Sequence, residues 1–302
     1  MRKFLLLLLL LPSLGTAEPL RVFASVVPIK TFVQRIGGEH VDARAMVRPG
    51  FNPHTYDPTP QQITALASAA LYVRTGVPFE KAWMDRIQSA NLDMQVLDAR
   101  EGISLREMEA HEHDEHEGHD EHEGHAEHEE HDSHAGEHDH EQDPHVWTSP
   151  PLAKHMAGNI RDKLNQLAPE HAADFTRNHD ALLAELDALD AELNTLLDPL
   201  VNRKFMVFHP AWGYFADHYR LIQVPIEHEG KSPGARALAA LIEQAKQENI
   251  KVIFVQPQFD KRQARQVAQA IGGVVVAVDP LAANYTDNLR RVGQHFARAL
   301  QH

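Results

Sequence analysis

The sequence predicts an α/β protein of two lobes, each with a parallel sheet flanked by helices, and one long helix between them. Three observations support this prediction. Short apolar runs alternate with amphipathic stretches in both halves of the chain, a leucine-striped helix separates the halves, and 302 residues suit more than one domain. Such alternation is typical of parallel strands joined by crossover helices.

In the first half, strands are expected at the short apolar runs and helices where apolar residues recur every three or four positions. The expected strands cover residues 21–27, 41–47, 71–74 and 94–98. The expected helices cover residues 28–36, 61–69 and 80–90. This order of elements predicts the first parallel sheet.

Two helices are expected in the middle of the chain, the first from Pro150 or Pro151 to Leu167 and the second over residues 169–197. The second carries leucines at three- and four-residue spacing, interleaved with acidic residues. A helix of roughly 28 residues is about 40 Å long, which suits a stiff rod between domains.

The second half repeats the alternation. The expected strands cover residues 204–208, 221–226, 252–255 and 273–278, and the expected helices 212–219, 235–248, 261–270 and 284–300. We therefore expect an N-terminal α/β lobe over residues 18–168, a linking helix over 169–198 and a C-terminal α/β lobe over 199–302.

Residues 1–17 read as a cleavable signal peptide, with a basic start, an apolar run from Phe4 to Leu11 and small residues ending at Ala17. The run is too short for a membrane anchor, which needs about 20 residues. We expect an exported, periplasmic protein. The chain has no cysteine, so any metal must be bound through nitrogen or oxygen.

The net charge of -14 is concentrated in one segment. Residues 111–140 hold 13 carboxylates and no Lys or Arg, which leaves -14 + 13 = -1 for the remainder. A nearly neutral folded part argues against a nucleic-acid partner. The protein is expected to act as a monomer.

Four candidate ligands stand where strands are expected to end: His54, His145, His209 and Asp279. Ligands of open α/β sheets bind outside the carboxyl ends of strands. Three imidazoles and one carboxylate suit Zn²⁺ in tetrahedral geometry. Because two of the candidates come from each half, one shared ion would tie the two lobes together.

The surrounding motifs, at residues 52–58, 143–147, 208–215 and 279–281, resemble those of the cluster A-I metal-binding proteins, and among them the high-affinity zinc-uptake (ZnuA-type) members. The resemblance covers essentially the whole mature chain. It implies two lobes bridged by a rigid helix and metal ligands at His54, His145, His209 and Asp279.

The implied function is zinc uptake, in which a periplasmic solute-binding protein delivers Zn²⁺ to the membrane permease and ATPase subunits of an ABC transporter. His209 favours zinc, because the zinc members that the chain resembles have His at this position, whereas the manganese members of the family usually have Glu. Gln256 stands where relatives often carry glutamate and is not counted as a ligand. Some members also carry a glutamate just before the first ligand histidine, where this chain has Pro53. That loop therefore offers no carboxylate, and Asp279 or water must complete the coordination shell.

The segment over residues 108–142 is rich in histidine and acid and cannot bury a core, so we expect it to be disordered without metal. Its imidazoles predict weak, labile zinc sites, although a solvated spacer is the simpler alternative. These histidines are His111, His113, His116, His119, His122, His125, His128, His131, His134, His138 and His140.

Three other functions compete with zinc uptake: a manganese- or iron-binding protein of the same fold, a zinc hydrolase, and a periplasmic zinc buffer or adhesin. The chain has no His-Glu-x-x-His run and no separate general base beside the four residues, so we expect no enzyme. Ligand histidines must be neutral, which predicts a steep loss of zinc affinity below about pH 6.

Overall fold

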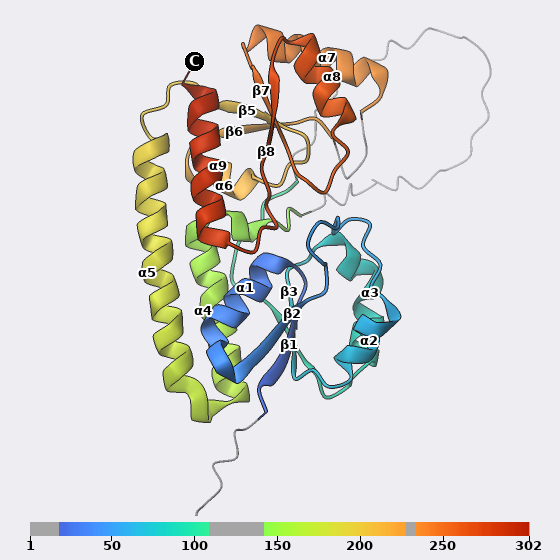
Figure 1. Ribbon diagram of the computed structural model, residues 1–302, viewed down its shortest axis with the longest axis vertical. Coiled ribbons are helices and arrows are strands. Elements are labelled where there is room, and N and C mark those ends of the chain that lie inside the picture. Colours follow the sequence, from blue (N-terminus) through green and yellow to red (C-terminus); the bar gives the residue numbers. More distant parts are fainter. Residues whose placement is uncertain (1–17, 109–141, 228–232, 302) are drawn as a thin grey trace, which may run out of the picture.

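The chain forms two lobes, each built on a parallel sheet, in a computed structural model that describes residues 18–108, 142–227 and 233–301 (Figure 1). The expected signal peptide and the eleven histidines of the acidic segment lie outside the described residues. Within the described part, each sheet has four strands, and the predicted α/β fold with two lobes is confirmed.

The N-terminal sheet has the strand order β2-β1-β3-β4. Its strands are β1 (Leu20–Ala24), β2 (Val41–Ala45), β3 (Leu71–Arg74) and β4 (Gln95–Asp98), and its helices are α1 (Val27–Gly37), α2 (Pro60–Leu66) and α3 (Pro78–Ser89). The first strand is shorter than expected because Pro28 already occupies the first turn of α1, a position that suits proline.

The C-terminal sheet repeats the same topology in the order β6-β5-β7-β8. Its strands are β5 (Lys204–Val207), β6 (Ile222–Pro225), β7 (Val252–Val255) and β8 (Val274–Ala277), and its helices are α6 (Gly213–His218), α7 (Ala235–Gln247), α8 (Arg262–Ala270) and α9 (Tyr285–Leu300). Every expected strand of this half has a counterpart here, with ends that coincide or differ by one residue.

Two helices join the lobes along one side of the molecule: α4 (Pro150–Leu167) and α5 (Ala172–Leu197) (Figure 1). The second begins after a 3₁₀ turn at Pro169–His171 instead of at Pro169. Its buried stripe includes Leu186, Leu189 and Leu193.

The long helix α5 is less isolated than the rod that its sequence suggested. It packs against α1 and α4 of the N-terminal lobe and against α9 of the C-terminal lobe. Its buried leucines belong to one apolar cluster that also contains Phe32 and Phe296, one from each lobe. Burial along this whole stripe holds both lobes to the same helix.

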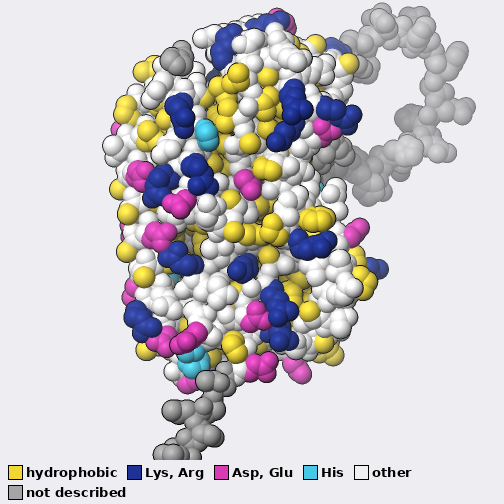
Figure 2. Space-filling model, in the orientation of Figure 1, with side chains coloured by type: hydrophobic (Ala, Val, Ile, Leu, Met, Phe, Trp, Pro, Cys, Tyr) yellow, Lys and Arg dark blue, Asp and Glu magenta, His cyan; other side chains and the backbone are white. Residues whose placement is uncertain are grey.

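In the described part of the chain, no helix combines the length and apolar composition that a membrane crossing requires. Basic and acidic side chains are interspersed over the face in Figure 2, without a large patch of one sign. This pattern agrees with the near-zero charge expected outside the acidic segment and gives that face no footprint for nucleic acid.

Candidate metal centre

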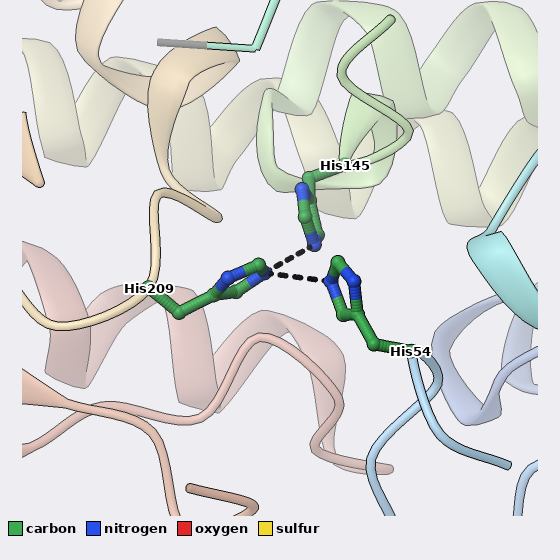
Figure 3. A group of neighbouring side chains, drawn as sticks. All are labelled: His54, His145 and His209. Carbon is green, nitrogen blue, oxygen red and sulfur yellow. Dashed lines mark hydrogen bonds between the residues drawn. The ribbon is translucent and has the colours of Figure 1, made fainter. Parts of the chain in front are cut away.

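Three histidine side chains from separate segments meet between the lobes (Figure 3). The Nε2 atom of His209 lies 3.3 Å from Nε2 of His54 and 3.3 Å from Nε2 of His145. His54 belongs to the loop after β2 and His209 follows β5, but His145 precedes the 3₁₀ turn Val146–Thr148 and, contrary to the prediction, does not stand at the end of a strand. The structure thus brings together three of the four residues that the sequence singled out.

The loops that carry these rings are fixed by local hydrogen bonds. The Asn52 side chain accepts a hydrogen bond from the backbone N–H of His54 at 2.9 Å, which tightens the turn between proline residues. The buried amide of Gln256 accepts from the backbone N–H of His209 and donates to its carbonyl oxygen at 2.6 Å. An amide makes both bonds whereas an ionised carboxylate can only accept, which explains why a Gln is suited to this position.

Two buried carboxylates bind the far nitrogens of the rings. Asp143 Oδ1 lies 2.8 Å from Nδ1 of His145, and Glu227 Oε1 lies 2.5 Å from Nδ1 of His209. A carboxylate accepts, so each Nδ1 carries the ring proton and each Nε2 presents its lone pair to the centre. Sequence reasoning missed both roles, although Glu227 follows β6 just as His209 follows β5.

The resulting arrangement of lone pairs favours a cation. Because neither Nε2 of His145 and His209 carries a proton, their 3.3 Å contact is repulsive unless a positive charge lies between them. Tetrahedral Zn²⁺ with bonds of 2.0–2.1 Å to histidine places neighbouring donors about 3.3–3.4 Å apart. The two measured separations equal the edge of that tetrahedron.

The space between the rings suits a single ion. A cavity of about 20 Å³ is lined by the three histidines together with Phe259, Pro280 and other residues. The His145 and His209 side chains are buried, and the Phe259 ring stacks on His209 with the centroids 4.6 Å apart. Phe259 was not anticipated from the sequence, since one aromatic residue in a loop gives no signal of its own.

Burial also controls protonation at this centre. It lowers the pKa of His54 from 6.5 to about 3, with His209 and His145 adding to the effect. Burial, followed by the neighbouring His145, lowers the pKa of His209 well below its ordinary value. Both rings therefore stay neutral, as zinc ligands must, at a pH where a solvated imidazole is already protonated.

This burial changes the pH dependence expected from sequence alone. Three solvated imidazoles of pKa 6.5 would lose about 10⁴-fold in zinc affinity between pH 7.5 and pH 5. Because the lowered pKa values remove proton competition at two rings, we expect a loss smaller than about a hundredfold. Competition against a chelator between pH 7.5 and pH 5 measures this loss of zinc affinity. A loss near the larger figure would show that the rings are solvated before zinc arrives.

Asp279 lies after β8, at the same edge of the C-terminal sheet, but its carboxylate is engaged elsewhere. Its Oδ1 atom accepts hydrogen bonds from Gln258 Nε2 at 2.8 Å and from the backbone N–H of Leu281 at 2.9 Å. Among the described residues, the donor group at the centre consists of His54, His145 and His209. That Asp279 completes the shell therefore stays a prediction, with a water molecule as the alternative.

Two buried aromatic residues take structural places around this centre. Trp147 contacts His145 edge to face and donates from Nε1 to the Pro280 carbonyl oxygen at 2.8 Å, which joins the two halves of the chain. The Tyr214 hydroxyl donates to the Asp143 carbonyl oxygen at 2.9 Å. These bonds hold the segment that positions His145.

Comparisons with known proteins agree with this geometry. The family model described as zinc-uptake complex component A, periplasmic, matches residues 22–299. The high-affinity zinc uptake system protein ZnuA of Bacillus subtilis (strain 168) is 30% identical over 271 residues, which cover 87% of this chain and 79% of that protein. The zinc-binding protein AdcA of Streptococcus pyogenes serotype M3 is 26% identical over 91% of this chain, but the chain spans only 53% of AdcA.

Solved structures give the same result. A crystal structure of ZnuA has a TM-score of 0.81 and 37% identity, covering 93% of this chain and 99% of that chain. A zinc-bound ZnuA deletion mutant also has a TM-score of 0.81, at 36% identity. Because the family model matches nearly the whole chain, residues 22–299, the chain belongs to the family of periplasmic zinc-uptake complex component A proteins.

Proposed function

We propose that this protein is the periplasmic zinc-binding component of an ABC transporter and delivers Zn²⁺ to a membrane permease driven by ATPase subunits. One observation carries the proposal: three histidine Nε2 atoms, contributed by both halves of the chain, converge at the spacing of zinc ligands. An ion bound there contacts both lobes, so binding is coupled to their relative position. That coupling lets a permease distinguish the loaded from the empty protein.

Zinc fits the centre better than manganese or iron. Three imidazole nitrogens form a borderline donor set, whereas manganese is suited to carboxylate, carbonyl and water oxygens. The two carboxylates nearest the rings bind Nδ1 protons, and each thereby makes its ring more basic. Among the described residues, the atoms that face the centre are therefore the imidazole nitrogens and not these carboxylate oxygens.

Metal competition tests this preference. We expect about a hundredfold excess of Mn²⁺ to leave zinc bound, because the affinity order of divalent ions places manganese well below zinc at nitrogen sites. The measurement is zinc retained by the full-length protein after dialysis against both ions. Displacement of zinc at equal free concentrations would assign the centre to manganese instead.

Growth under zinc starvation tests transport. A strain that lacks this protein and any paralogue should fail to grow in chelator-treated medium and recover when zinc is added. The wild-type chain should restore growth, whereas a His209→Ala chain should not. Normal growth of the deletion strain would eliminate uptake as the function, and a zinc buffer would then be the better description.

The two ends of the histidine-rich segment lie close to the metal centre. Glu107, which precedes the segment, and Gln142, its last residue, form an isolated antiparallel bridge, and Asp143 follows directly. Weak zinc sites among the histidines of this segment would thus be anchored next to the residues that orient His145. Capture of zinc for transfer to the centre is the role that we propose for them.

Transport also fits the local chemistry better than hydrolysis. A catalytic zinc site needs an open position and a base beside it. In the described part of the chain, the carboxylates that reach the rings, Asp143 and Glu227, are bonded to imidazole Nδ1 atoms. Export through a cleaved signal peptide and action as a monomer complete the proposal.

A further inference from the structure

We infer that the protein has a second binding site for an imidazole-seeking divalent cation such as Zn²⁺, formed by His40, His171 and Asp174. One donor atom from each of these residues lies within 4.8 Å of the others. The site is independent of the centre between the lobes and of the proposed transport function. It lies at the beginning of α5, at the end of the N-terminal lobe away from the C-terminal lobe (Figure 1).

The two imidazoles already lie against each other. The His40 and His171 rings stack with centroids 3.7 Å apart and planes 11° apart. Nε2 of His40 lies 2.9 Å from Oδ2 of Asp174. Zinc donors stand about 3.3–3.6 Å apart around one ion, and the rings must tilt from their parallel stack so that both lone pairs point at it.

The scaffold beneath the rings is rigid. The Gln34 side chain donates to the carbonyl oxygens of Gly38 and Val41, which fixes the 3₁₀ turn Gly38–His40. The buried Phe175 ring meets both histidine rings edge to face. A site whose donors are held by packed elements loses little conformational entropy when it binds an ion.

The donors are also accessible and chemically suited. The side chains of His40 and Asp174 are 20% and 37% exposed, and that of His171 is 26% exposed, so an ion can enter from solvent. Two imidazoles and one carboxylate form a nitrogen and oxygen set that suits Zn²⁺, with water in the remaining positions. When the ion replaces the bond from His40 to Asp174, the ring proton moves from Nε2 to Nδ1.

Two features limit the affinity. Arg177 holds the other oxygen of Asp174 at 2.7 Å and offsets part of its charge. Open water positions and partial exposure weaken each bond relative to the buried three-histidine centre. We therefore expect this second site to fill only after the centre between the lobes.

The consequence of binding is mechanical. His40 stands at the junction of α1 and β2, while His171 and Asp174 belong to the turn between α4 and α5 and to the first turn of α5. An ion shared by them would fasten the base of the long helix to the N-terminal lobe. Zinc abundance would then stiffen the element against which both lobes pack.

Anomalous diffraction at the zinc edge locates the ion directly. Crystals of the full-length protein equilibrated with excess zinc should show, besides the peak between the lobes, a second peak within bonding distance of His40, His171 and Asp174. With the first peak present at full occupancy, the absence of the second would overturn the proposal.

Hydrogen exchange supplies a solution test that zinc bound elsewhere would not imitate. Zinc should slow amide exchange in residues 172–176 of the wild-type chain and of a His295→Asn control. His295 lies on α9, and it belongs to none of the ligand groups found among the described residues. A His171→Asn variant should lose that protection while it keeps zinc-dependent protection around His209. Equal protection in this variant and in wild type would contradict the second site.

Discussion

Replacement of His209 by alanine is expected to weaken zinc binding by more than about a hundredfold. Loss of a residue that only hydrogen-bonds a metal ligand costs at most about that much. His209 is the histidine whose Nε2 atom lies 3.3 Å from both of the others. It is also the one member of this group that comes from the C-terminal half. Without it, the remaining pair belongs to the N-terminal half, and zinc no longer ties the lobes together.

Competition against a high-affinity chelator measures this loss, because such a chelator removes zinc from weak sites elsewhere in the chain. Small-angle scattering gives a second readout: zinc should compact the wild-type protein but not the variant. A His295→Ala chain is the matched control, since it also loses one imidazole. Affinity within about tenfold of wild type, with the fold intact by circular dichroism, would remove His209 from the ligand set.

The second large effect is expected at the carboxylates behind the rings. Glu227→Ala should weaken zinc binding by about 10- to 100-fold, because His209 then loses the acceptor that holds its proton on Nδ1 and raises the basicity of Nε2. Glu227→Gln should lie near the lower end of that range. Its amide oxygen can still accept a hydrogen bond from the Nδ1–H group of His209, but the negative charge is gone.

Asp143→Asn provides the corresponding test at His145, where the carboxylate also accepts from the backbone N–H of the same residue at 2.9 Å. The same chelator competition applies, with Glu243→Gln as control, because Glu243 is a solvent-facing partner of Lys246 on α7. If Glu227→Ala bound zinc as wild type does, the carboxylate would have only a structural role. A thermal melt of each variant separates lost affinity from lost folding.

The agreement between the predicted and observed strands has a local cause. Most of the strands are short apolar runs that stand out in the sequence, as in β3 and β7, whose predicted and observed bounds coincide. Prolines set the starts of α1, α3 and α4 in the same local way. Errors of one to three residues fall at element ends, where capping and tertiary packing compete.

The partners of the ligands could not be obtained in this way. Glu227 meets His209 across 18 positions of sequence, and the Gln256 amide meets the same residue across 47. Both contacts exist because β6 and β7 flank β5 in the sheet, which brings the loops after these three strands to one edge. Sequence periodicity reports which face of a strand is buried, not which strand lies next to it.

By itself, the sequence determined the α/β class, the two repeated halves, the long helix and the three candidate imidazoles, because each depends on residue type and short-range pattern. The tertiary structure alone decided which strand-end residues meet, which carboxylates orient them, and that His40 approaches Asp174 across 134 positions. Distances between side chains from different loops follow from strand order and helix packing. These depend on the burial of the whole chain at once.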